Sequence, residues 1–185
     1  MSASESNRRF FDSSAFILSF VGVLLAFAAL GVAAAAYSRS DDAKAAVRKV
    51  AASGVVPSTT KVTLQEFSMT PHPSVVRAGK VRIEADNVGS ATHELVLVRA
   101  ASVAALPHVT VATSERAVGD VDEEAIASSD TVGETGDVEP RGHVTKTFDL
   151  QPGTYVMFCN IDDTSPDGTV TNHFQQGMSA MLVAV

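Results

Sequence analysis

The only cysteine of the chain is followed at short range by a histidine and a methionine. Cys159 ends an apolar stretch, His173 comes after an intervening segment of thirteen residues, and Met178 stands five positions further on. A thiolate is a soft anionic ligand that suits copper(I), whereas an imidazole and a thioether are neutral ligands that keep both copper oxidation states accessible. Two imidazoles, one thiolate and a weak axial methionine form a blue-copper site. The three residues therefore predict a copper site that needs one more histidine.

The second imidazole is predicted to come from His93, which opens an apolar, strand-like run upstream of the cysteine. A distant strand would then supply this ligand. The other three histidines stand beside prolines or at the start of a strand, and we predict that they lie at the surface: His72, His108 and His143.

Residues 61–185 resemble the cupredoxin family, the small blue-copper proteins that shuttle single electrons. The resemblance rests on short stretches in a fixed order, which are residues 62–67, 78–83, 87–89, 93–95, 148–159 and 173–178. It implies an all-β fold, a Greek-key β-sandwich, with one type 1 copper ion. It also implies a ligand set of His93, Cys159, His173 and Met178. In this family electrons commonly pass through the exposed edge of the loop histidine, here His173, and an apolar patch with Phe174 would bring a partner close.

Two features depart from the family's pattern. The segment between the cysteine and the second histidine, residues 160–172, is longer than the resemblance leads us to expect. It is rich in turn formers, so it is predicted to bulge into solvent while its ends stay close together. Many cupredoxins carry an asparagine directly after the first histidine, where this chain has Glu94. This change bears on the hydrogen bond that the thiolate receives from that part of the site.

The β-rich part of the chain begins near residue 61, where short runs of valine, threonine and isoleucine alternate with glycine and proline. Seven strands are predicted, which suits a Greek-key sandwich. They are residues 61–69, 74–76, 80–87, 93–99, 144–150, 153–160 and 179–185. Residues 100–143 form an insertion that is acidic between 114 and 140. This insertion is predicted either as a solvated, partly mobile excursion with one helical turn or as an acidic docking face for a basic redox partner.

Residues 15–37 are uncharged over 23 positions, which exceeds the roughly 20 residues that a membrane-spanning helix needs. We expect a transmembrane signal-anchor helix there, after a short tail of residues 1–14. A cleaved signal peptide, giving a secreted form, is the alternative, because residues 34–36 would suit a peptidase. Residues 38–60 are predicted to be a stalk or linker. The site chemistry favours a position of the copper domain on the extracytoplasmic face, periplasmic or outer.

The length, net charge and cysteine content of the chain exclude some further classes of function. The chain has 185 residues, a formal net charge of -7 and one cysteine, so one domain with additions is expected, without an internal disulfide framework. The negative charge disfavours nucleic acid as a partner and leaves a basic protein partner open. The chain offers no second histidine cluster, so we expect no enzyme activity of the multicopper kind and no small-molecule substrate.

Three functions remain from the sequence. The first is an electron carrier at the membrane surface that exchanges single electrons with redox partner proteins. The second is a copper(I)-binding chaperone or sensor, tethered to the membrane, without an electron-carrier role. The third is a copper-free interaction module or accessory subunit, in which Cys159 is only a buried structural thiol.

Overall fold

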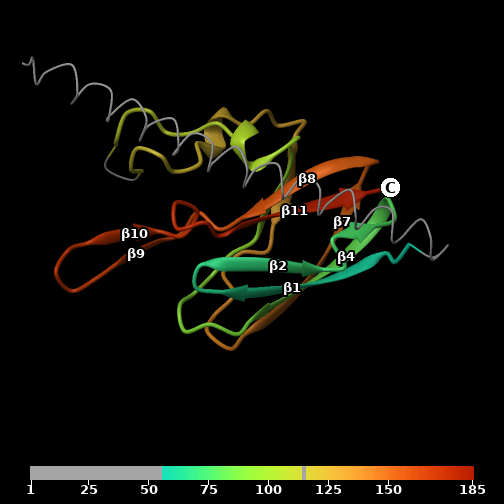
Figure 1. Cartoon of the computed structure of the whole chain (residues 1–185), viewed down its shortest axis with the longest axis horizontal. Coiled ribbons are helices and arrows are strands. Elements are labelled where there is room, and N and C mark those ends of the chain that lie inside the picture. The colour runs from blue at the N-terminus through green and yellow to red at the C-terminus, as the bar shows by residue number, and fades with distance from the viewer. Residues whose placement is uncertain (1–55, 114–115) are drawn as a thin grey trace, which may run out of the picture. The chain divides into compact units, whose positions relative to one another are not determined.

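The computed structural model describes residues 56–113 and 116–185, which form strands, loops and two short 3₁₀ turns (Figure 1). No α-helix occurs among these residues, and the predicted all-β class is confirmed. The strands of the first sheet, in the order β2-β1-β4-β7, are β1 (Thr59–Gln65), β2 (Ser68–His72), β4 (Gly79–Asn87) and β7 (His143–Leu150). Strands β1 and β4 run parallel, whereas the other two pairs are antiparallel.

The second sheet has five strands in the order β3-β11-β8-β5-β6. They are β3 (Val75–Val76), β5 (Val96–Arg99), β6 (Thr131–Glu134), β8 (Gly153–Phe158) and β11 (Ser179–Ala184). A separate hairpin consists of β9 (Asp162–Thr164) and β10 (Val170–Asn172), and it extends beyond the ends of β1, β2, β8 and β11 in Figure 1. The 3₁₀ turns are η1 (Val103–Ala105) and η2 (Glu123–Ala125).

The two sheets pack face to face because their inward side chains share one buried cluster. Alternate residues of a strand point to opposite faces of its sheet, so each strand contributes every second residue. The first sheet contributes Val62, Leu64, Val81, Ile83, Ala85, Phe148 and Leu150, and the second contributes Leu97, Tyr155, Met157, Leu182 and Ala184. Fully burying one aliphatic or aromatic side chain is worth about 1.5–3 kcal/mol, so this cluster is a main source of the stability that fixes the strand ends.

Strand β8 is buried on both of its faces. Tyr155 and Met157 point into the shared core, whereas Val156 and Phe158 belong to a second buried cluster with Leu106 and Val121 of the insertion. The insertion therefore covers the outer face of the second sheet. The alternation that sends residues 155 and 157 inward also sends the next odd residue, the cysteine, to the inner face.

Several predicted elements differ from the observed ones. The single strand predicted at residues 61–69 is two antiparallel strands, β1 and β2, because the chain turns at Glu66 and Phe67. The strand predicted at 93–99 begins only at Val96, and His93 makes an isolated bridge with Val138. The segment 100–143 was predicted, as one alternative, to be a solvated excursion, and this is wrong. The segment supplies β6, which pairs with β5, and it packs on the second sheet.

The helix predicted at residues 15–37 and the tail at 1–14 lie outside the described residues, as does most of the linker at 38–60. Within the ranges 56–113 and 116–185, no helix reaches the length and apolarity that crossing a membrane requires. The membrane anchor therefore stays a prediction.

Candidate metal centre

Three side chains from distant parts of the chain converge at one end of the sandwich. The Nδ1 atoms of His93 and His173 lie 3.2 Å apart, and the sulfur of Cys159 lies 3.3 Å from Nδ1 of His173. All three donor atoms are within 4.8 Å of one another, and all three side chains are fully buried. The structure thus brings together three of the four predicted ligands.

His93 is held by a loop that a buried asparagine anchors. Asn87, the last residue of β4, donates from Nδ2 to the carbonyl oxygens of Ala91 and Val138, both at 2.8 Å, and its Oδ1 accepts the amide of Gly89 at 2.9 Å. His93 also exchanges two backbone hydrogen bonds with Val138, at 3.1 and 2.6 Å. These bonds fix the backbone from which the imidazole reaches into the centre.

His173 and Met178 are the first and last residues of one tight turn. The amide of Met178 donates to the carbonyl of His173 at 3.0 Å, and the amide of Cys159 donates to the carbonyl of Met178 at 3.2 Å. Gly177 has a φ of 101°, a left-handed conformation that glycine adopts without steric cost. The side chain of Met178 is fully buried in the same core cluster as Cys159. The fourth predicted ligand therefore lies on the inner side of the turn, next to the cysteine backbone.

The long segment 160–172 loops out as the β9–β10 hairpin, and its tip is exposed as predicted. Its ends stay close, because the amide of His173 donates to the carbonyl of Ile161 at 2.9 Å, and Nδ2 of Asn172 donates to the carbonyl of Asn160 at 3.2 Å. The sequence did not predict that Asp163 turns back onto the centre. Its Oδ2 lies 2.9 Å from Nε2 of His173.

The expected exposed edge of His173 is wrong for this chain. The imidazole is 0% exposed because Asp163 covers Nε2 and the ring of Phe67 lies 5.1 Å away, centroid to centroid. Phe174 is only half-buried, but it packs on Phe158 and on His108 at centroid distances of 6.0 and 5.6 Å. The longer segment thus shields the edge that the resemblance implied to be open.

The sulfur of Cys159 receives a backbone hydrogen bond at the position where the chain departs from the family pattern. The amide of Glu94 donates to Sγ at 3.4 Å, and any residue except proline could make this bond because the donor belongs to the backbone. The carboxylate of Glu94 accepts the amide of Asn160 at 3.1 Å and so ties the two donor loops together. Burial raises the pKa of the Cys159 thiol to about 11, although the amides of Glu94 and Ile161 lower it. A cation in contact with the sulfur deprotonates such a thiol outright.

His93 has the protonation and surroundings of a metal ligand. Burial, and then the neighbouring His173, lower the pKa of His93, so its imidazole is neutral and offers a lone pair at pH 7. Its Nε2 is the one buried side-chain nitrogen or oxygen without a hydrogen-bond partner in the part of the chain described, and it lies 3.7 Å from Oε1 of Glu66. A cation held by Nδ1 would leave the proton of His93 on Nε2, which faces the Glu66 carboxylate.

These donors fit one type 1 copper ion. Metal–imidazole bonds are about 2.0–2.1 Å long, so two nitrogens 3.2 Å apart can bind the same ion. One thiolate and two imidazoles, with the thioether side chain of Met178 in the same buried cluster as Cys159, are the donor types that copper prefers at such sites.

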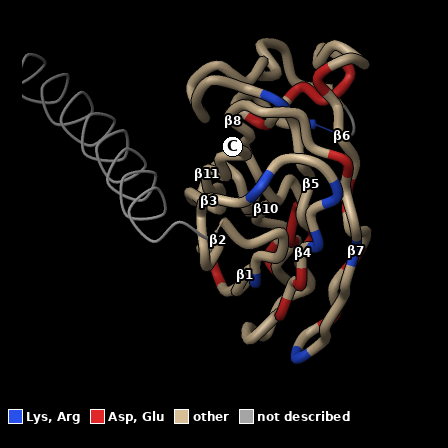
Figure 2. The backbone as a smooth tube through the Cα atoms, turned by 90° about the vertical axis from the view of Figure 1, so that its right-hand side faces the viewer, with Lys and Arg blue, Asp and Glu red and all other residues tan. Residues whose placement is uncertain are grey.

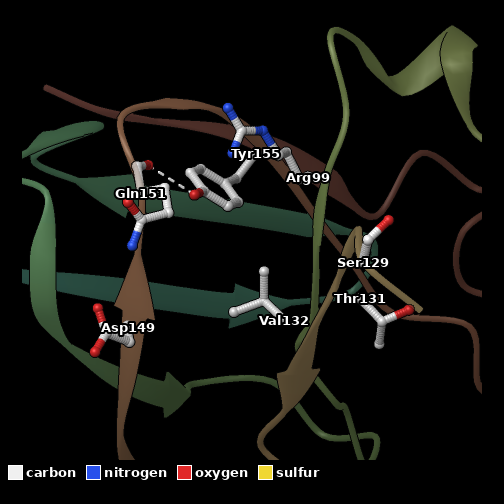
Figure 3. A pocket seen from close by; sticks show the side chains of 7 residues that line it. All are labelled: Arg99, Ser129, Thr131, Val132, Asp149, Gln151 and Tyr155. Atoms are coloured by element: carbon white, nitrogen blue, oxygen red, sulfur yellow. Dashed lines mark hydrogen bonds between the residues drawn. The ribbon is translucent and has the colours of Figure 1, made fainter. Parts of the chain in front are cut away.

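The other histidines are exposed, as predicted: His72, His108 and His143. A surface hollow elsewhere is lined by residues of both sheets, such as Arg99, Asp149 and Tyr155 (Figure 3). The hydroxyl of Tyr155 donates to the carbonyl of Gln151 at 2.7 Å. No donor residue of the metal centre lines this hollow. It is a separate surface feature.

No family model matches the chain, and no curated protein sequence matches it. Similar solved structures include an auracyanin from Roseiflexus castenholzii, with 20% identity, coverage of 71% of this chain and 99% of that one, and a TM-score of 0.48. Auracyanin A, a "blue" copper protein from Chloroflexus aurantiacus, has 20% identity, coverage of 70% and 99%, and a TM-score of 0.42. Reduced rusticyanin has 16% identity, coverage of 71% and 82%, and a TM-score of 0.43. The cluster of His93, Cys159 and His173 agrees with the donor set that the resemblance to the cupredoxins implied.

Proposed function

We propose that this chain carries single electrons through one type 1 copper ion, which His93, Cys159 and His173 would hold, with Met178 as a weaker fourth ligand. The observation that carries the proposal is the buried convergence of one thiol sulfur and two Nδ1 atoms within 4.8 Å. When bound, copper supplies one-electron exchange between its two oxidation states.

The surrounding residues hold the donors in place and exclude water. Asn87 fixes the loop of His93, and the turn from His173 to Met178 is bonded to the backbone of Cys159. Ligands that shift little between the oxidation states keep the reorganisation small. The amide of Glu94 at the sulfur is one of the hydrogen bonds that set the reduction potential of such a site.

The partner in this proposal is a redox protein with a basic contact surface. The net charge of -7 supports a basic partner, because complementary charge raises the rate of encounter. The charge is not confined to one exposed patch: acidic positions occur among the loops and along the strands in Figure 2. Part of the acidic insertion also serves the fold, since Asp120 is fully buried and accepts the amide of Ala117 at 2.7 Å.

We further propose that the copper domain stands on the extracytoplasmic face, held by a helix at residues 15–37 or released by its cleavage. The length of the uncharged run supports the anchor. The copper(I) chaperone or sensor without a carrier role is the competing function, and it requires that the ion leave the site readily.

The proposal is tested by adding copper(II) to the full chain and recording absorption and paramagnetic-resonance spectra. We expect an intense thiolate-to-copper band in the visible region, at one ion per chain, and no such band for Cys159→Ser. Uptake of copper(I) alone, with no colour in copper(II), would contradict the electron carrier and favour the chaperone.

A further inference from the structure

The carboxylate of Asp163 is the least expected neighbour of the metal centre. It comes from β9, in the segment that makes the chain longer than its family pattern, and its Oδ2 lies 2.9 Å from Nε2 of His173. We propose that Asp163 is a positioning residue that fixes the tautomer and orientation of His173 and lowers the reduction potential of the site. This inference rests on the proposed copper function and adds the control of its potential.

The hairpin register directs this side chain to the centre. Consecutive residues of a strand point to opposite sides. Asp162 turns outward to accept Nδ2 of Asn172 at 2.8 Å, and Asp163, opposite Thr171, turns to the imidazole. The hairpin is closed below them by the bond between the amide of His173 and the carbonyl of Ile161. The contact is therefore built into the hairpin.

The carboxylate decides which nitrogen of His173 carries the proton. A carboxylate only accepts hydrogen bonds, so Nε2 must be the protonated nitrogen at this contact. Nδ1 is then left with its lone pair, and this atom faces the sulfur of Cys159 at 3.3 Å and Nδ1 of His93 at 3.2 Å. Histidine ligands of metals are commonly oriented in this way by a carboxylate on the remote nitrogen.

The contact between Asp163 and His173 would also favour copper(II) over copper(I). The negative charge of a carboxylate behind the imidazole would attract the extra positive charge of copper(II). The imidazole is fully buried while the carboxylate is about half exposed, at 49% of its side chain, so water screens the charge only in part.

The second histidine lacks an equivalent contact. Oε1 of Glu66 lies 3.7 Å from Nε2 of His93, beyond hydrogen-bond distance, and this oxygen already accepts the amides of Ser90 and Ala91. The two imidazoles are thus held differently, one by a side-chain hydrogen bond and the other by its own loop. Replacing Asp163 therefore removes a hydrogen bond from one imidazole only, that of His173, while its charge also acts on His93 and Cys159.

The test compares Asp163→Asn with Asp167→Asn in the full chain. Asp167 lies at the exposed tip of the same hairpin and accepts the amide of Thr169 at 3.0 Å, so its replacement removes the same charge without touching His173. Loss of a carboxylate behind a metal ligand typically weakens metal binding about 10- to 100-fold. For Asp163→Asn we expect the ratio of copper(II) to copper(I) at a fixed potential to fall about tenfold, which is a rise of about 59 mV for one electron. The potential of Asp167→Asn should match that of the native chain.

Ring-nitrogen NMR before copper is added gives a readout that needs no metal. His173 should show one tautomer, protonated at Nε2, in the native chain and in Asp167→Asn, and a mixture in Asp163→Asn. A blue Asp163→Asn protein with an unchanged potential and tautomer would overturn the inference while leaving the proposed function standing. If the copper-loaded Asp163→Asn variant has no visible band, the Asp163→Glu variant decides the question. A visible band in Asp163→Glu supports the inference, and the absence of a band in that variant contradicts it. A native chain without the band overturns both proposals together.

Discussion

Two carboxylate–histidine pairs in this domain lie in different surroundings. Asp163 meets His173 at the metal centre, and Asp86 meets His143 on the surface, where the two residues face each other on β4 and β7. The imidazole of His173 is fully buried, whereas that of His143 is 52% exposed. Asp86 is also paired with Lys61.

The second nitrogen of each imidazole shows why only one pair belongs to a metal centre. In His143 this atom, Nε2, meets the hydroxyl of Thr145 at 3.0 Å. In His173 it is Nδ1, which meets the sulfur of Cys159 and the second imidazole in a buried place. Burial strengthens electrostatic interactions that water would otherwise screen. A carboxylate can orient a histidine at the surface as well as in the interior, but a metal site also needs further donor atoms and the exclusion of water.

Replacing each of the two histidines by alanine should give the largest difference between the two pairs in copper binding. His173→Ala deletes one of three donors, and we expect complete loss of the visible band of the copper-loaded chain. His143→Ala should keep the band, its intensity and its one-to-one copper stoichiometry. The measurement is an absorption titration of both variants with copper(II). A band that survives His173→Ala, or disappears in His143→Ala, would reverse the assignment of the two pairs.

Removing the carboxylate of the surface pair, Asp86 and His143, should have a smaller effect, which is confined to the free energy of unfolding. The Lys61 ammonium, and then His143, hold the pKa of Asp86 below its ordinary value. A carboxyl with a lowered pKa stabilises the fold fully above its unfolded pKa of about 3.9, and this contribution is lost as the pH falls through the folded pKa. Asp86→Asn should therefore lower the free energy of unfolding at pH 7 by at most about 1 kcal/mol.

Urea unfolding of the native chain and Asp86→Asn measures this difference at pH 7 and again near pH 3. The gap should shrink at the lower pH, because below about 3.9 the unfolded carboxyl takes up a proton and the lowered pKa of the folded group contributes less stability. The copper band should be unaffected at pH 7. A gap that persists at low pH would show that the aspartate acts through packing instead of charge.

The sequence predicted the donors better than their surroundings. His93, Cys159 and His173 are brought together as expected, because their types and order carry the chemistry. Strands β4, β7, β8 and β11 lie within about two residues of their predicted bounds, since the apolar residues alternate in β4 and β7 and form short continuous runs in β8 and β11. These elements follow from local pattern.

Other features depend on contacts between distant residues. Strand β6 was missed because Thr131–Glu134 has no apolar alternation and exists only through its pairing with β5. Turn formers predicted that residues 160–172 loop out, but turn composition does not fix a hairpin register, and the register is what aims Asp163 at His173. The burial of His173 depends on the same hairpin register, so the sequence could not predict it.

The central claim is most directly tested by a redox titration of the full chain loaded with one equivalent of copper. We predict a visible band that disappears on reduction and returns fully on oxidation, following a single one-electron transition, with copper retained through repeated cycles in the presence of a copper(I) chelator. Retention is expected because all three donors are buried and anchored. Loss of copper to the chelator on the first reduction would contradict an electron carrier and support a protein that delivers or senses copper(I).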